Sequence, residues 1–459
     1  MWWAGAAAYI GTFCTVLMLG QANAMLPTLV DYFHTDVATI QWVVLAYSVT
    51  MAGLLLAFGR LADVAGRKRI YTIGYAGFAV GSLLCAASPS FPLFLVSRIV
   101  QGVFAAMIGA NAVAVITQTF AAEQRGMALG MWSTVTASAQ LLGPSLAGLL
   151  IQGVGWQANF GVQAGLGTLG AVLAHRALPD FPRQAAPFDL SGAAALAVTI
   201  ASFTVLLNRG PKLGWTSPLA LGLLALGLLA GAAFGWLSRR ATAPVLSLRL
   251  LANRRFAFSN ACVFLTWMGL QATGFVLPFF LQKVVGLSPA EMGLMLMAQP
   301  ALILVVSPLG GWLTDRFGSR LPATAGTLCD VAAVLFLATA TPATARSGLV
   351  LRLAATGVGA GLAQAANSAA IMGEAPRGQA GMASGLAGTM RHLGLVTGTA
   401  VIGTFFSVRS GMHAGAGAPI EAGYFAGFRD ALYVLAFTHG LSALVSALRG
   451  PHQAEPAVA

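Results

Sequence analysis

Long apolar runs separated by short polar segments dominate this chain of 459 residues. A helix needs about 20 mostly apolar residues to cross a bilayer, and we count fourteen runs of about this length. Their approximate limits are 5–30, 38–59, 70–88, 92–117, 126–151, 156–175, 190–208, 217–238, 256–281, 290–313, 321–341, 348–372, 381–407 and 425–448. Because the runs are long and continuously apolar, they exclude a porin-like barrel of short alternating strands. The sequence therefore predicts an all-α membrane protein with no room for a soluble domain.

Charged residues are scarce, at 8% of the chain, whereas about 25% is usual in a soluble domain. The net charge of +12 does not indicate a nucleic-acid partner, because the basic residues are spread among the apolar runs instead of forming a patch. Most of the 25 lysines and arginines fall in alternate loops if the N-terminus is inside. The positive-inside rule then predicts a multi-pass protein of the cytoplasmic membrane with both termini cytoplasmic.

Cysteine and histidine positions give no sign of an active site or a metal centre. The four cysteines lie inside apolar segments without metal-binding spacing, so disulfides and metal are not expected: Cys14, Cys85, Cys262 and Cys329. The six histidines are scattered and form no catalytic constellation. The first apolar run lacks a basic leading segment and is long, so it is predicted to be a span and not a signal peptide. We therefore expect no enzyme and no cofactor.

A ten-residue segment occurs twice. Gly59-Arg-Leu-Ala-Asp63-Val-Ala-Gly66-Arg67-Lys68 recurs as Gly311-Trp-Leu-Thr-Asp315-Arg316-Phe-Gly318-Ser-Arg320, and both copies follow a span that runs towards the inside. Duplicated halves that share a loop motif are typical of secondary transporters.

These segments resemble motif A of the major facilitator superfamily. The sequence around Arg98 is similar to motif B, and the fifth span, with Gly130, Gly143, Pro144 and Gly148, is similar to the antiporter motif C. Two spans beyond the usual twelve resemble the fourteen-helix drug:proton antiporter branch. So do three further segments: Phe188 to Gly192, Gly214 with Trp215, and Leu277 to Gln282.

The resemblance implies the major facilitator fold, with six-helix bundles at 1–180 and 251–459 and a two-helix linker hairpin at 181–250. It implies a secondary active exporter of drug-like or amphipathic metabolite molecules, which works by alternating access as a monomer in the bilayer. Proton antiport would supply the energy, and the activity would appear as multidrug efflux or antibiotic resistance. Two alternatives stay open: a facilitator-type importer or uniporter of a small metabolite, and a non-transporting membrane sensor or scaffold.

Motif A places a carboxylate, Asp63, at a helix end with Arg67 and Lys68 close behind. A carboxylate there can cap a helix and pair with arginine, and the family implies a latch that stabilises the outward-facing state. A solvated basic loop is the alternative. For the fifth span, small residues and proline allow close helix packing. The family implies a seal against leak, and a general packing groove is the alternative.

Four ionisable residues inside the spans are candidates for proton coupling: Arg98, Asp330, Arg391 and His392. A charge at the centre of a spanning helix costs at least about 2.5–3.5 kcal/mol, so each needs either a function or a partner. For Asp330, protonation and a structural ion pair are both open, and His392 is either a proton carrier or a packing residue. Asp430 and His439 in the last span are weaker candidates. The branch usually carries an acid where this chain has Met18.

Polar and aromatic residues inside the spans are candidates for a central substrate cavity, or for hydrogen bonds between helices. They are Gln21, Asn23, Gln41, Tyr47, Asn111, Gln140, Asn260, Trp267, Gln271, Gln299, Gln364 and Asn367. As a set they suit a large amphipathic molecule. Because arginines outnumber acids inside the spans, we expect a neutral or anionic substrate.

Overall fold

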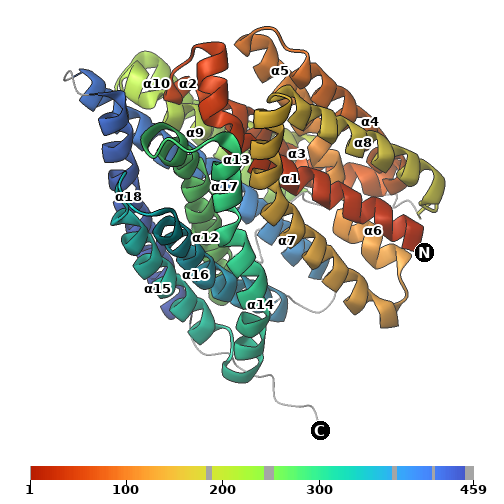
Figure 1. Cartoon of the computed structure of the whole chain (residues 1–459). Helices are drawn as coiled ribbons and strands as arrows, with labels where there is room; N and C mark the ends of the chain where they lie inside the picture. Colours follow the sequence, from red (N-terminus) through yellow and green to blue (C-terminus); the bar gives the residue numbers. More distant parts are fainter. Residues whose placement is uncertain (1, 182–188, 242–252, 375–379, 416–418, 450–459) are drawn as a thin grey trace.

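The computed structural model describes residues 2–181, 189–241, 253–374, 380–415 and 419–449 (Figure 1). Throughout these ranges the regular structure is helical. The helices are α1 (Trp2–Phe33), α2 (Val37–Ile40), α3 (Trp42–Ala65), α4 (Arg67–Ala86), α5 (Phe91–Gly109), α6 (Ala112–Thr119), α7 (Ala122–Gly153), α8 (Gln157–Ala177), α9 (Leu190–Leu213), α10 (Pro218–Arg240), α12 (Arg254–Phe279), the π-helix η1 (Phe280–Val284), α13 (Pro289–Leu296), α14 (Ala298–Phe317), α15 (Arg320–Ala338), α16 (Arg346–Gly373), α17 (Ala380–Gly415) and α18 (Ile420–Ala447).

The predicted spans are present as helices. Thirteen helical segments in the described residues are long and apolar enough to cross a membrane. The predicted span at 156–175 is α8, a helix of 21 residues that is less apolar because it holds Gln157, Asn159 and Gln163. It packs against α1 and α4 like the other members of its bundle.

Four predicted spans are interrupted among the described residues. The second is interrupted at Gln41, between α2 and α3. The fourth bends at Ala110 and Asn111, between α5 and α6. The tenth breaks at Met297, three residues before Pro300, because a proline ring clashes with the carbonyl four residues earlier. Pro278 in the last turn of α12 precedes the π-helix η1. Broken helices at membrane depth are typical of transporters.

Short sequence signals fix several helix ends. Asp189 begins α9 by accepting a hydrogen bond from the backbone N–H of Gly192 at 2.8 Å. Ser288 and Glu291 form a capping box at the start of α13. Gly66 and Gly318, the glycines of the repeated motif, end α3 and α14 with φ of 101° and 75°. Glycine adopts such positive φ at little steric cost, so the motif stops both helices at equivalent places.

Two helical bundles make up most of the molecule. The first consists of α1 to α8 and the second of α12 to α18, and α9 lies between them in contact with α3 and α17. The helices α9 and α10 form a hairpin within the range 181–250 (Figure 1). Several leucines of α10 are exposed, among them Leu226, Leu228 and Leu229. The predicted linker limit at 250 and Phe188 lie outside the described residues.

The two ends of the bundles differ in the connections that they contain. The motif end contains Gly66 and Gly318, and the opposite end contains the α1–α2 and η1–α13 connections. The start of α1 lies at the motif end, because Trp2 packs against Phe120 beyond α6. The end of α18 also lies there, because Thr324 at the start of α15 donates a hydrogen bond to Ser446 at 3.0 Å.

Candidate functional site

The two bundles are in backbone contact where α7 meets α13, at the opposite end. A Cβ atom on Gly148 would lie 2.9 Å from the carbonyl carbon of Pro289. From the other side, a Cβ atom on Gly293 would lie 2.5 Å from the carbonyl oxygen of Pro144. Only glycine permits this approach at either position. The antiporter-like residues of α7 therefore form part of the contact between the bundles.

The remaining glycines of that motif have different surroundings. Gly143 packs against α1, where its added Cβ would lie 3.1 Å from the Cα of Gly20. Gly130, nearer the motif end, has no atom within 4 Å of such a Cβ. The tight part of the motif is thus confined to the half of α7 at the opposite end.

Polar contacts strengthen the same end. The Lys283 ammonium on η1 donates to the Asp31 carboxylate at the end of α1, at 2.5 and 2.7 Å. The backbone N–H of Ala290 donates to the Gln152 side chain at 3.3 Å. The bundles are therefore closed together at the end opposite the motif loops.

The first motif loop holds a charged cluster. The Asp63 carboxylate pairs with Arg67, and Arg60 lies 3.8 Å from it. Arg67 also donates to Asn111 at 3.0 Å, at the break between α5 and α6. Arg67 thus connects the start of α4 to the end of α3 and to the α5–α6 break. Asn111, a cavity candidate from sequence, lies in this cluster.

The second motif loop has a different arrangement. Asp315 is exposed and makes no ion pair with the residues that the structure describes. The Arg316 guanidinium lies over the rings of Trp312 and Phe317, at 5.5 and 5.7 Å. Gly311 has open space around it. The two copies share the glycine-terminated helix but not the carboxylate–arginine pair.

Arg98 lies fully buried within the first bundle. Its Nε donates to the Val43 carbonyl at 2.8 Å and its Nη1 donates to Gln101 at 2.5 Å. The guanidinium also lies 4.5 Å from the centre of the Tyr47 ring, a distance typical of a cation–π contact. Its Nη2 has no hydrogen-bond partner in the described residues. Arg98 therefore joins α5 to α3 through neutral groups.

Met18, at the position where the resembled branch usually carries an acid, lies beside the Arg98 cluster. Gln101, the partner of Arg98, donates to the Ser82 hydroxyl at 2.8 Å and to the Met18 sulfur at 3.7 Å. An acid at this position of α1 would lie next to the amide that holds Arg98. Met18 leaves a weak acceptor there instead.

Amide side chains connect elements of the two halves. Asn23 on α1 and Gln271 on α12 face each other, with Gln271 donating to Asn23 at 3.2 Å and to Thr399 on α17 at 3.1 Å. Asn208 on α9 donates to Gln41 at 2.6 Å. Three predicted cavity residues thus form a polar bridge between elements of both halves.

Other cavity candidates lie inside one bundle. Gln21 donates to Asn159 at 3.1 Å and accepts from Gln163 at 2.7 Å, so it joins α1 to α8. In the second bundle, Asn367 accepts from the buried Arg449 at 2.6 Å.

Three more candidates have no long-range hydrogen-bond partner among the residues that the structure describes. Asn260 donates to a carbonyl of its own helix, the one at Phe256, at 2.9 Å. Gln140 and Gln364 are half-buried. The partners Asn159, Gln163 and Asn208 stood as polar residues within predicted spans, but their helix faces were not evident from the sequence.

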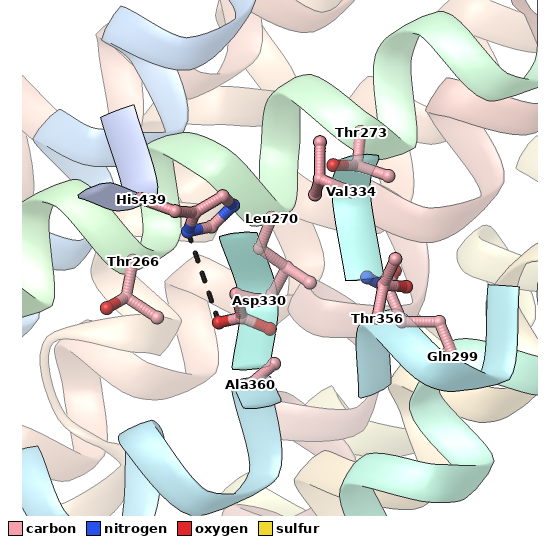
Figure 2. A pocket seen from close by; sticks show the side chains of 9 residues that line it. All are labelled: Thr266, Leu270, Thr273, Gln299, Asp330, Val334, Thr356, Ala360 and His439. Atoms are coloured by element: carbon pink, nitrogen blue, oxygen red, sulfur yellow. Dashed lines mark ion pairs between the residues drawn. The ribbon is translucent and has the colours of Figure 1, made fainter. Parts of the chain in front are cut away.

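Asp330 lies inside the second bundle beside His439, as Figure 2 shows. The Asp330 Oδ2 and the His439 Nδ1 are 4.0 Å apart, and both side chains are buried. They line a small cavity with seven uncharged residues: Thr266, Leu270, Thr273, Gln299, Val334, Thr356 and Ala360. His439 was a weaker candidate from the sequence, because the sequence does not show that α18 packs against α15.

Arg391 and His392 lie on α17. The Arg391 guanidinium lies 5.4 Å from the ring centre of Trp267 on α12. No ion pair joins Arg391 to a residue in the described part of the chain. His392 is half-buried. Within the described residues, no group of three or more His, Cys, Asp or Glu side chains is arranged to hold a metal ion.

Comparison with known proteins identifies the family. The sequence model of the Major Facilitator Superfamily matches residues 8–399 and, in a second match, 257–456. The chain therefore belongs to the major facilitator superfamily, a class of membrane transporters and not of enzymes.

Similar sequences include drug-resistance proteins. The chain is 31% identical to the multidrug resistance protein Stp of Mycobacterium tuberculosis, over 87% of this chain and 74% of that protein. It is also 31% identical to the tetracenomycin C resistance and export protein of Streptomyces glaucescens, over 84% and 72%. Identity to the riboflavin transporter RibZ of Clostridioides difficile is 28%, over 87% and 86%. The predicted resemblance to the fourteen-helix drug-exporter branch is confirmed.

Among solved structures, a bacterial homologue of the human lysosomal transporter Spinster, in an inward-facing and unoccupied conformation, superimposes with a TM-score of 0.70. Its sequence is 15% identical, and the match covers 97% of this chain and 96% of that one. The likeness confirms the predicted all-α major facilitator fold.

Proposed function

We propose that this protein is a secondary active exporter of drug-like or amphipathic metabolite molecules, which works by alternating access and proton antiport in the cytoplasmic membrane. The observation that carries the proposal is the glycine and proline contact of α7 with α13, at residues of the antiporter-like motif. Two relatives at 31% identity, one a multidrug resistance protein and one a resistance and export protein, support the same class.

The transport cycle follows from which end is closed. With both termini cytoplasmic, the motif end faces the cytoplasm and the closed α7–α13 contact faces outward. The arrangement is then inward-facing, ready to take a substrate from the cytoplasm. Export requires the α7–α13 contact to open and the motif end to close, and the bundles at 1–180 and 251–459 move as units while the linker at 181–250 stays at the side.

The motif loops supply the contacts that stabilise the outward-facing state. In the inward-facing arrangement, the Asp63–Arg67 pair is held within the first bundle. Asp63, Arg67 and Lys68 stand at the end that must close, so they can stabilise the outward-facing state when the second loop approaches. Gly59 and Gly66 keep that loop short, and Gly311, Asp315, Arg316, Gly318 and Arg320 provide the surface that approaches it.

The substrate is proposed to be neutral or anionic and partly aromatic. Arg391 offers an arginine without a carboxylate partner in the described residues, stacked on the indole of Trp267. An anionic or electron-rich group is attracted to such a cation. Asn23 and Gln271 add amide groups that can hydrogen-bond to the same molecule once the bundles separate.

The test uses purified full-length protein in liposomes. Tetracenomycin C, riboflavin and ethidium are first compared for binding by thermal shift, and the bound compounds are then followed under an imposed pH gradient. We expect uphill accumulation of the neutral or anionic compounds, driven by the proton gradient, and its loss when a protonophore is added. Accumulation of ethidium alone would contradict the substrate class. Downhill movement that ignores the gradient would favour a uniporter, which the similarity to a riboflavin transporter keeps as the second candidate.

A further inference from the structure

A buried pair of ionisable side chains lies in the second bundle, apart from the Arg98 cluster. Asp330 is 3% exposed and His439 is 5% exposed. They come from α15 and α18, which are far apart in the sequence and pack side by side. Figure 2 shows the carboxylate and the imidazole directed towards each other across the cavity.

Two glycines make room for this pair. On α12, a Cβ atom on Gly269 would lie 2.5 Å from the His439 Nε2, so any larger residue would displace the ring. On α16, a Cβ atom on Gly359 would lie 2.6 Å from the backbone nitrogen of Asp330 and closer still to its carboxylate. Four helices are thus shaped around the two side chains.

The pair contains unpartnered polar atoms at its centre. Neither Asp330 Oδ2 nor His439 Nδ1 has a hydrogen-bond partner in the described part of the chain. Their separation of 4.0 Å is too long for a direct hydrogen bond. The Thr266 hydroxyl also has no partner there. A buried polar group without a partner costs about 1–3 kcal/mol. A proton bound between these facing atoms would lower that cost, because it supplies a donor.

The electric charge of the site depends on a single proton. The residues that line the cavity from α12, α14, α15 and α16 are uncharged apart from Asp330, and His439 is the titratable residue that α18 contributes. With Asp330 ionised and His439 neutral, the buried pair carries one negative charge. One bound proton makes it neutral. Burying an uncompensated charge costs several kcal/mol, so the closed bundle favours the proton-bound pair.

We propose that Asp330 is the residue that binds the coupling proton, with neutral His439 facing it as the partner that receives the proton when the site opens to water. This inference rests on the proposed proton antiport. It places the proton step in the second bundle, away from Arg98. Arginine stays charged under physiological conditions and cannot carry a proton.

A sodium ion is the competing occupant of such a site. Carboxylate, hydroxyl and amide oxygens from Asp330, Thr266 and Gln299 would suit a hard cation. The imidazole argues for the proton, because its nitrogen faces the carboxylate at the centre of the cavity, where an oxygen ligand would be needed. The experiment therefore includes sodium.

The first measurement reads the carboxyl group directly and needs no substrate. Purified full-length protein in lipid nanodiscs is compared at low and high pH by infrared difference spectroscopy. We expect a carboxylic-acid C=O band that disappears as the pH is raised, is lost in Asp330→Asn and shifts in His439→Gln. The control is Asp430→Asn on α18, whose carboxylate pairs with Arg409 at 2.6 Å nearer the opposite end. This variant should keep the band unshifted.

The second measurement reads coupling in liposomes, with tetracenomycin C as the probe. Asp330→Asn should lose accumulation driven by a pH gradient and keep exchange of labelled for unlabelled probe. The Asp430→Asn control should keep both. Loss of the infrared band on addition of Na⁺ at constant pH would overturn the proposal in favour of a sodium site.

Failure of the proton-site assignment can be told apart from failure of the proposed proton antiport. If the band persists in Asp330→Asn, or if this variant still accumulates the probe like the parent, the assignment of the proton site is wrong while proton antiport stands. If the parent itself shows no gradient-driven accumulation, the proposed function fails, and the infrared arm still decides where a proton binds.

Discussion

Replacing Gly148 with alanine should open the α7–α13 contact between the bundles. The added Cβ would lie 2.9 Å from the Pro289 carbonyl carbon and 3.2 Å from the Ala290 Cα, and nearer still to the carbonyl oxygen. These are backbone atoms, which cannot turn away as a flexible side chain can. The helices α7 and α13 must therefore separate by about 0.5–1 Å, or the contact must break.

The size of the effect follows from the cost of overpacking. An extra methyl group in a tightly packed contact costs about 1–3 kcal/mol. The cost applies only to the state in which α7 touches α13, so the equilibrium moves towards the state open at that end by roughly five- to 150-fold. The matched control is Gly130→Ala on the same helix, where an added Cβ meets nothing within 4 Å.

Distances between spin labels report the shift. Val154 at the end of α7 and Ile420 at the start of α18 are 79% and 63% exposed, and both lie at the opposite end. Labels at these two sites, in a background in which the exposed Cys329 is serine, should show a longer distance in Gly148→Ala. The Gly130→Ala control should match the parent. An unchanged distribution in Gly148→Ala, or an equal change in both variants, would refute the reasoning.

Three further variants test the clusters described above. Asp63→Asn removes the partner of Arg67 and should abolish gradient-driven transport in liposomes, while immunoblotting shows normal amounts of protein in the membrane. Full transport by this variant would contradict the role of Asp63 as a latch. Arg98→Met leaves the Val43 carbonyl and Gln101 without their buried donor and should cost about 2–4 kcal/mol, which a melting curve in detergent would show as a clearly lower midpoint; an unchanged midpoint would contradict its bridging role. Lys283→Met removes a partly exposed ion pair worth about 1 kcal/mol or less, so the spin-label distance should change less than in Gly148→Ala. In 1 M salt this variant and the parent should show the same distance, because the Debye length is then about 3 Å.

Much of this fold could be predicted from the sequence, because a bilayer accepts few solutions. Apolar length alone located the helices, and the glycines of the repeated motif end α3 and α14 at equivalent places. The breaks in the helices were harder. Pro300 marks the break at Met297, but the bend at Ala110 and Asn111 has no proline. The contact found there, a hydrogen bond from Arg67 to Asn111, cannot be read from the spacing of residues along one helix.

The site was only partly predictable, because spacing along one helix does not show which helix lies opposite. Arg98 was recognised as needing an explanation, and the structure supplies neutral partners instead of an acid. Asn111 resembled a cavity residue in sequence and lies with the motif cluster. His439 was underrated because its relation to Asp330 exists only when α15 and α18 pack together.

Movement of protons during transport tests the central claim most directly. Liposomes that contain the full-length protein and a trapped pH-sensitive dye are prepared without a gradient, and a compound that binds the protein is added outside. Antiport predicts that the internal pH rises as the compound enters, because protons leave in exchange. Entry of the compound with no change in internal pH, or with a fall, would contradict proton antiport.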